Sequence, residues 1–180
     1  MSVENDQGAV TALESQDVTS DIGERLAGKY MDFKLAEEEY GLEILKVQEI
    51  LKLMDITRVP RTERFIRGVI NLRGRVIPVV DLRLKFEMEE TEATEQTVII
   101  VVQFEVEGAN VTMGIMVDEV LEVLDIDRDQ IEPTPNFGTE TDTDFFLGVG
   151  KVDRRVIFLL DIGRVLSGSE AAAIASMANG

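Results

Sequence analysis

Cysteine and histidine are both missing from this chain of 180 residues. Without cysteine the protein can form no disulfide, carry no thiolate nucleophile and offer no sulfur ligand to a metal. Without histidine it lacks the commonest general base and the commonest transition-metal ligand. All of the serines lie in the two tails of the chain: Ser2, Ser15, Ser20, Ser167, Ser169 and Ser176. These absences argue against an enzyme, and we expect no metal and no cofactor.

Long apolar runs are missing as well. The longest, such as Val98–Val102 and Val156–Leu160, are far too short to span a bilayer. The N-terminus is acidic and lacks the charged-then-apolar pattern of a signal peptide. Hydrophobic residues nevertheless make up 44% of the chain, which is enough to fill a core. The sequence therefore predicts a soluble, cytoplasmic protein with no direct membrane insertion.

Charge is plentiful but unevenly spread over a chain whose net charge is −17. Residues 58–85 contain eight basic and two acidic residues, a local net charge of +6, whereas residues 118–132 contain seven acidic and one basic, a net of −6. This polarity could steer a partner of mixed charge, or it could serve solubility and local ion pairs. Phe65 is the only aromatic residue among the first four arginines, and the overall charge opposes a polyanion, so we expect no nucleic acid.

Two short motifs come close to known ligand loops and fail. The stretch "GVGKV" at Gly148–Val152 lacks the earlier glycine and the following Ser or Thr of a phosphate-binding loop. The stretch "DIDRDQ" at Asp125–Gln130 has glutamine where a calcium-binding loop needs glycine. We interpret the three aspartates of this stretch as a solvated face or turn.

The chain contains an internal duplication. "GVINLRGRVIPVVDLRLKF" at Gly68–Phe86 matches "GVGKVDRRVIFLLDIGRVL" at Gly148–Leu166 with an offset of 80 residues (148 − 68). Further upstream, "YGLEILKVQEIL" at Tyr40–Leu51 matches "MGIMVDEVLEVL" at Met113–Leu124, and the two blocks have the same order in both halves. Two copies indicate a pair of related subdomains, not a solenoid.

Most of the expected elements are strands. Residues 29–35 and 40–44 read as a hairpin, whose first strand carries the polar Asp32 and Lys34. Residues 45–54 fit either a helical turn or a strand, and residues 61–68 read as a helical turn that starts at Thr62 and stops at Gly68. Strands on either side of Arg73-Gly74 should form a second hairpin, apolar on both faces, in which Pro78 marks a strand edge or bulge where the sheet opens. Residues 87–96 read as an acidic linker, residues 97–120 as a hairpin with its turn near Gly108, and residues 132–144 as a long loop.

Several stretches resemble the chemotaxis coupling proteins, the CheW-like family: "EEEYGLEILKVQEIL", "TRVPRTERFIRGVINLRGRVIPVVDLRLKF" and "GIMVDEVLEVL". The resemblance spans about Tyr30–Leu166 and is most specific in Tyr40–Phe86. It implies a mainly β fold in which two SH3-like five-stranded β-barrels pack together, with short helical segments and a C-terminal helix or tail. We accordingly divide the chain into a disordered acidic tail (1–27), a CheW-like domain (28–167) and a C-terminal tail (168–180). Within the domain we expect subdomains at about 29–86 and 97–166, and exchange of strands between them is left open.

The resemblance also implies a function. The family consists of non-catalytic adaptors that join the cytoplasmic tips of methyl-accepting chemoreceptors to the regulatory domain of the chemotaxis histidine kinase. The length of the chain favours a coupler that stands alone. The alternative is a β-barrel binding module for a small or polymeric ligand.

Family positions linked to receptor binding fall on Val47, Glu49, Val98, Ile99, Val120 and Val123. From pattern alone the apolar ones read equally well as core and Glu49 as a solvated charge. Gly68, Asn71 and Arg73 match a block linked to partner binding or to the integrity of that region. Glu49 and Arg73 each sit in an otherwise apolar stretch, where an unpaired charge is costly, so we predict that they form an ion pair.

Overall fold

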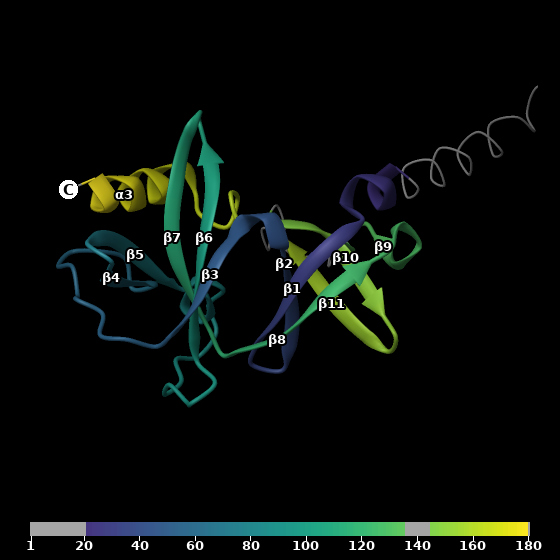
Figure 1. Ribbon diagram of the computed structural model, residues 1–180, viewed down its shortest axis with the longest axis horizontal. Coiled ribbons are helices and arrows are strands. Elements are labelled where there is room, and N and C mark those ends of the chain that lie inside the picture. Colours follow the sequence, from purple (N-terminus) through teal and green to yellow (C-terminus); the bar gives the residue numbers. More distant parts are fainter. Residues whose placement is uncertain (1–20, 136–144, 180) are drawn as a thin grey trace, which may run out of the picture.

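The computed structural model describes residues 21–135 and 145–179, which form two antiparallel-rich sheets and a C-terminal helix (Figure 1). Sheet A has the strand order β8-β1-β2-β11-β10-β9, and sheet B has the order β3-β6-β7-β5-β4. The strands of sheet A are β1 (Gly28–Leu35), β2 (Glu38–Glu43), β8 (Glu119–Ile126), β9 (Ile131–Glu132), β10 (Phe146–Val152) and β11 (Arg155–Leu160). The strands of sheet B are β3 (Val47–Lys52), β4 (Ile66–Leu72), β5 (Arg75–Asp81), β6 (Val98–Val106) and β7 (Ala109–Val117). Short helical segments are η1 (Ile44–Lys46), α2 (Leu82–Lys85) and η2 (Arg128–Gln130), and the C-terminal helix is α3 (Gly168–Asn179).

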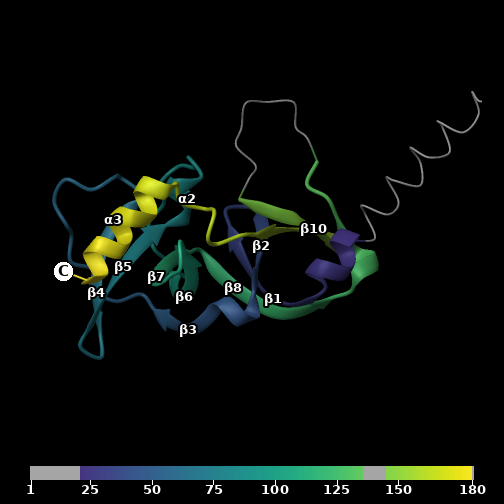
Figure 2. The same ribbon diagram turned by 90° about the horizontal axis from the view of Figure 1, so that it is seen from above.

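The prediction of a mainly β fold built from two packed five-stranded units with a C-terminal helix is confirmed, and sheet A carries the two-residue β9 as an addition. Figure 2 shows the two sheets side by side along the long axis, with α3 lying over sheet B. The duplication seen in the sequence is present in the backbone. The β4–β5 and β10–β11 hairpins both shift register at the glycine that begins the repeat, Gly68 and Gly148.

Each of these hairpins also has an equivalent parallel neighbour. Val79 of β5 lies opposite Gly114 of β7, and the matching Leu159 of β11 lies opposite Gly41 of β2. Both glycines are close to their neighbours, since a Cβ on Gly114 would lie 2.6 Å from a methyl carbon of Ile99. The two sheets are therefore assembled in the same way from equivalent parts.

Strands are exchanged between the two halves of the sequence. β3 follows β2 in the chain but pairs with β6, and β8 follows β7 but pairs with β1. Each sheet thus takes two strands from one half and the rest from the other half. The division at residues 86–97 separates the two sequence repeats, but it does not separate the two sheets, because neither half supplies all the strands of a sheet.

Three apolar clusters hold this arrangement together. One lies within sheet A and includes Tyr30 and Leu159, and a second lies within sheet B and includes Ile77 and Val79. The third and largest joins both sheets to α3, for example through Phe33 of β1. β5 contributes to two of these clusters, which explains why its sequence is apolar on both faces.

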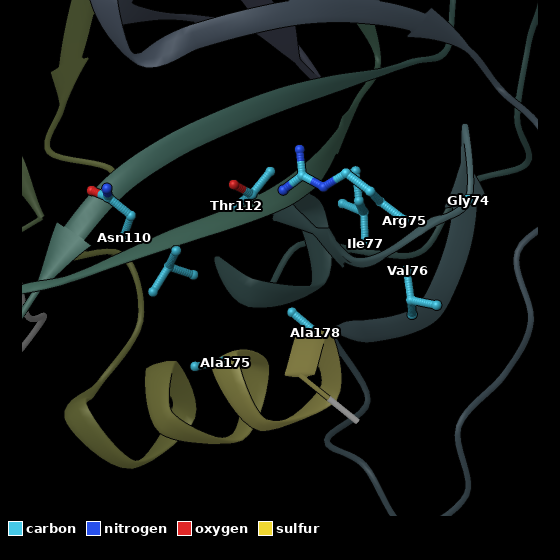
Figure 3. Close-up of a pocket in the computed structure, with 9 residues that line it drawn as sticks. Gly74, Arg75, Val76, Ile77, Asn110, Thr112, Ala175 and Ala178 are labelled. Carbon is cyan, nitrogen blue, oxygen red and sulfur yellow. The ribbon is translucent and has the colours of Figure 1, made fainter.

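Pro78 lies where β5 separates from β7. The β5–β7 pairing begins only at Val79, so the preceding residues of β5 pair with β4 alone. The sheet opens there as predicted, although β5 is an interior strand of sheet B and not an edge strand. The opening is a cavity of about 410 Å³ between β5, β7 and α3, and Figure 3 shows Arg75 and Thr112 on its sheet side and Ala175 and Ala178 on its helix side.

Two other expectations need correction. Residues 61–68 do not form a helical turn that stops at Gly68, because β4 begins at Ile66 and pairs with β5. The Thr62 hydroxyl donates to the carbonyl of Val59 and caps no helix. Residues 21–26 are helical and not disordered: Ile22 and Leu26 pack against the cluster within sheet A.

The structure also resolves the expectations for residues 45–54, for the third hairpin and for the C-terminal tail. Residues 45–54 contain both alternatives, the helical turn η1 followed by strand β3, and the turn of the third hairpin lies at Glu107-Gly108. The small-residue tail is the helix α3, and its Ala171 and Ile174 are buried. The expectations for residues 1–20 and 136–144 lie outside the described residues.

Candidate interaction surface

β3 and β8 are edge strands at equivalent positions of the two repeats. Val47 and Glu49 on β3 correspond to Val120 and Glu122 on β8, at an offset of 73 residues (120 − 47). Among the residues that the structure describes, β3 ends the order of sheet B and β8 ends the order of sheet A, so each strand has one edge without a ladder partner there. Both strands also carry the chain from one sheet to the other. We give the name junction surface to six residues of these two strands that are exposed or half-buried: Val47, Glu49, Ile50, Val120, Leu121 and Val123.

Exposed apolar side chains are the unusual feature of the junction surface. Ile50 is 42% exposed and Val123 is 52% exposed, and the two residues are again equivalent in the repeat. Leu45, in the turn that leads into β3, is 93% exposed. Apolar side chains gathered on exposed edge strands are typical of surfaces that bind another chain.

The predicted receptor-binding residues divide into three groups. Val123 of β8 is exposed, and Glu49 of β3 is half-buried. Val47, Val98 and Val120 are half-buried and pack against the cluster that joins the two sheets. Ile99 is fully buried in the cluster within sheet B, so its side chain cannot touch a partner, and the core interpretation is the correct one for this residue.

Sequence reasoning missed Ile50, Leu121 and Leu45. The sequence could have identified Ile50 as exposed. Strand alternation places its side chain on the opposite face from those of Glu49 and Leu51, which point inward, and the repeat aligns it with Val123. The sequence does not mark Leu45 as exposed, because the pattern around it fits both a helical turn and a strand and so fixes no outward face.

Glu49 and Arg73 form the predicted ion pair. The two terminal nitrogens of Arg73 donate to the two carboxylate oxygens of Glu49 at 2.9 and 3.0 Å. Arg73 lies directly after β4, so this pair connects the two edge strands of sheet B. The hydrogen bonds from Arg73 lower the pKa of the Glu49 carboxyl. The guanidinium is 74% exposed, so the pair belongs to the surface and not to the core.

Gly68, Asn71 and Arg73 all shape the β4–β5 hairpin. Gly68 has φ +140°, and a Cβ there would lie 2.1 Å from the carbonyl oxygen of Thr57. Asn71 accepts a hydrogen bond from the backbone N–H of Gly74, and Arg73 and Gly74 both have positive φ, as a two-residue turn requires. Each of these three residues therefore makes a contact that fits the structural role predicted for this block.

A second ion-pair group lies in sheet A and includes Glu122, the repeat equivalent of Glu49. Arg155 of β11 binds Asp32 of β1 and Glu122 of β8, both at 3.1 Å, and lies 3.5 Å from Glu39 of β2. Asp32 is fully buried. Burial and the neighbouring Glu39 carboxyl raise the pKa of Asp32 to about 7, against the opposing effect of Arg155. This group ties the edge strand β8 to three strands of its sheet.

The described residues contain no group of three or more acidic side chains placed to hold a metal ion. Asp127, from the stretch that resembles a calcium loop, instead begins η2, where Gln130 accepts from its backbone N–H. Within the same residues, no helix has the length and apolar character needed to cross a membrane.

Comparison with known proteins places this geometry in a family. The family model described as "CheW-like domain" matches residues 29–170. The chemotaxis protein CheW of Klebsiella aerogenes is 41% identical over 156 residues, which covers 87% of this chain and 92% of that protein. The chemotaxis protein CheW of Bacillus subtilis is 35% identical over 139 residues, 77% of this chain and 86% of that protein. Among solved structures, the scaffolding protein TtCheW from Thermoanaerobacter tengcongensis matches with a TM-score of 0.70 and 39% identity, covering 81% of this chain and 97% of that one.

Proposed function

The chain belongs to the CheW-like family, and from this premise we propose that it is a chemotaxis adaptor that couples chemoreceptors to the chemotaxis histidine kinase. It binds the cytoplasmic tip of a methyl-accepting receptor with one surface and the regulatory domain of the kinase with another. It works in the cytoplasm and carries the receptor signal by binding alone, without catalysis, cofactor or nucleic acid.

The observation that carries the receptor side of this proposal is the junction surface. Ile50 and Val123 are exposed apolar residues at equivalent positions of two edge strands. A partner that covers them removes apolar area from water, and the unpaired strand edges beside them offer backbone hydrogen bonds. Glu49 lies next to Ile50 and is already oriented by Arg73, so a charged group of the partner meets a fixed carboxylate.

The adaptor proposal requires binding to two partners at once. The test is a pull-down of the kinase regulatory domain with the purified protein, with and without a receptor cytoplasmic fragment. We expect each partner to bind alone, both to bind together, and the reconstituted mixture to show receptor-dependent kinase activity. Competition of the two partners for one surface would contradict a bridge. Tight binding of a glycan or small ligand, with no affinity for either protein, would support the binding-module alternative.

Reversing a charge on the junction surface should weaken binding of the receptor and not of the kinase. Glu49→Lys reverses the fixed carboxylate and is expected to weaken binding of the receptor fragment at least about tenfold while leaving kinase binding within about twofold. Glu105→Lys is the matched control, because it makes the same charge change at an exposed residue of β6 outside the junction surface. Equal losses in both arms would show that Glu49→Lys damages the fold and would count against the assigned surface.

A further inference from the structure

Three carboxyl groups gather around one arginine in sheet A. Asp32 of β1 is fully buried, the side chain of Glu39 on β2 is 17% exposed, and Glu122 belongs to the edge strand β8. Arg155 of β11 donates hydrogen bonds to Asp32 and to Glu122, both at 3.1 Å. One guanidinium therefore faces three carboxyl groups and can balance the charge of only one of them.

Two oxygens of this cluster are buried without a hydrogen-bond donor. Among the described residues, no group donates to Oδ1 of Asp32 or to Oε1 of Glu39. The Nε of Arg155 lies 3.5 Å from Oε1 of Glu39 but lacks hydrogen-bond geometry. The Asp32 and Glu39 carboxyl groups are close enough to hydrogen-bond to each other, which is possible only if one of them carries a proton. A single proton therefore gives this pair a donor and removes a charge that Arg155 cannot balance.

Strand β8 is the element most exposed to the charge of this cluster. Asp32 lies directly opposite Glu122 in the β1–β8 register, and like charges in directly opposed positions destabilise a strand pair. The β1–β8 pairing also shifts register between Asp32 and Phe33. Among the described residues β1 is the only ladder partner of β8, which ends the order of sheet A (Figure 1). Repulsion between Asp32 and Glu122 therefore acts on the one ladder that holds β8.

The other titratable groups beside Asp32 do not balance this charge. Lys34, two positions later on β1, lies in register with Glu119 of β8, and among the described residues no ion pair joins it to the cluster. Tyr30, two positions earlier, donates its hydroxyl to the backbone carbonyl four residues before it. Burial, followed by the hydrogen bond and the charge of Glu39, raises the pKa of Asp32 to about 7. The cluster therefore binds and releases its proton near neutral pH.

We propose that Asp32 and Glu39 hold one proton between them, and that this proton keeps strand β8 paired with β1. With the proton bound, Arg155 links the Asp32–Glu39 pair to Glu122 across the sheet. Once the proton is lost, Asp32 and Glu122 oppose each other as anions, and β8 separates from β1 more often. This is a pH-sensitive device of the fold, and it does not depend on the proposed function.

The two halves of the junction surface then respond differently to pH. Its β8 half is Val120, Leu121 and Val123, so the order of these residues depends on the shared proton. Its β3 half is held by the exposed pair of Glu49 and Arg73, and hydrogen bonds from Arg73 lower the pKa of the Glu49 carboxyl. That pair stays ionised around neutral pH. Strand β3 is therefore an internal control for strand β8 in the same molecule.

The test is amide hydrogen exchange of the full-length protein, measured by mass spectrometry at about pH 6, 7 and 8 and expressed as protection factors, which correct for the intrinsic effect of pH. Because the folded protein raises the pKa of Asp32, the proton stabilises β8 at low pH, and this stabilisation fades as the pH rises through about 7. Protection of Glu119–Ile126 should fall about tenfold between about pH 6 and about pH 8, since opening releases one proton. Protection of Val47–Lys52 should stay within about twofold.

Variants identify the groups that hold the proton. Asp32→Asn is neutral at every pH, so β8 protection should vary by no more than about twofold over the same range. Glu39→Gln can donate its amide N–H to an ionised Asp32, so the fall in β8 protection should shrink to about threefold or less. Glu38→Gln makes the same change at an exposed neighbour on β2 and should keep the full fall. Circular dichroism checks that each variant is folded, and the matched glutamate variants decide the question even if Asp32→Asn folds poorly.

Four results would overturn the proposal. The first is no fall in β8 protection with pH, and the second is an equal fall in β3, which would indicate a general effect of pH on the fold. The third is an unchanged fall in Asp32→Asn, which would assign the effect to another group. The fourth is the same fall in Glu39→Gln as in Glu38→Gln, which would show that Asp32 titrates alone and shares no proton with Glu39.

Discussion

Glu49 and Arg73 connect the two edge strands of sheet B through two parallel hydrogen bonds. The chain between these two residues makes a further contact with β4. Thr57, in the loop after β3, pairs with Val69 of β4 as an isolated bridge. In sheet A, Arg155 similarly reaches Glu122 of the edge strand β8, and Glu122 is the repeat equivalent of Glu49. In both sheets an arginine from the hairpin region therefore holds the strand that forms the junction surface.

The first prediction concerns the energy of the Glu49–Arg73 pair. Because Arg73 is largely exposed, Glu49→Gln and Arg73→Gln should each cause only a small loss of thermal stability. The double variant should lose less than the sum of the two, and this coupling should fade at high salt. The control cycle replaces Arg73→Gln by Arg154→Gln, an exposed arginine outside the pair, and should be additive. Additive shifts in the Glu49–Arg73 cycle would show that the pair has no energetic role.

The second prediction is a pH dependence centred on Asp32. Burial raises its pKa from 3.8 to about 7, so the fold favours the protonated form. The stabilisation from this group is complete below about pH 4 and is lost as the pH rises through about 7. Asp32→Asn keeps the side chain neutral at every pH. The melting temperature of this variant, relative to the unchanged protein, should therefore be higher at about pH 8 than at about pH 5.

The other charges around Asp32 set the controls for that measurement. Arg155 faces Asp32 together with Glu39 and Glu122, so Arg155→Gln should destabilise the protein more at about pH 8, where the three carboxylates face one another without the cation. Asp125→Asn changes an exposed carboxylate on β8 and should leave the pH profile unaltered. A constant difference between Asp32→Asn and the unchanged protein across this pH range would refute the role of Asp32.

The parts of the fold that sequence could predict are those with a local signature. The duplicated hairpins follow from matching blocks, the turn at Arg73-Gly74 from a glycine between apolar strands, and the Glu49–Arg73 pair from two charges in apolar surroundings. Pro78 correctly marked the opening of the sheet, because a proline has no N–H to donate to a further strand.

The parts that sequence could not predict depend on long-range pairing. The residues of strand β3 would suit pairing with a strand of either repeat, so its local sequence does not reveal that it pairs with β6 of the other repeat. The alternating pattern that places Asp32 on the same side as Lys34 gives no sign that Asp32 is buried, and its partner Arg155 lies 123 positions later in the chain. Ile99 and Val123 have similar apolar surroundings in the sequence, yet one is in the core and the other on the surface.

The third prediction concerns the structural role of Gly68. Any side chain there must adopt φ +140° and would clash with the Thr57 carbonyl oxygen at 2.1 Å. Gly68→Ala should therefore destabilise the protein by about 3 kcal/mol or more in urea unfolding, as expected for a strained backbone plus a steric clash. Gly74→Ala is the matched control, since its φ is +84° but a Cβ there meets no atom of the described residues within 4 Å, and it should cost about 1 kcal/mol. Equal costs for the two variants would contradict the clash.

The fourth prediction contrasts Val123 and Ile99, which the family resemblance assigned to the same receptor site. Val123→Asp places a charge on an exposed strand position, so it should change stability by less than about 1 kcal/mol but weaken receptor binding at least about tenfold. Ile99→Val removes one methylene from a fully buried side chain, so it should cost about 1 kcal/mol of stability and leave receptor affinity unchanged. Val156→Asp, at a β11 position that is 48% exposed, controls for the added charge and should retain receptor binding. Calorimetric titration with a receptor fragment, combined with urea unfolding of each variant, distinguishes these effects. If Ile99→Val weakens binding while Val123→Asp does not, the receptor contacts the protein through a rearranged sheet B, and the junction surface in its present form is not the receptor site.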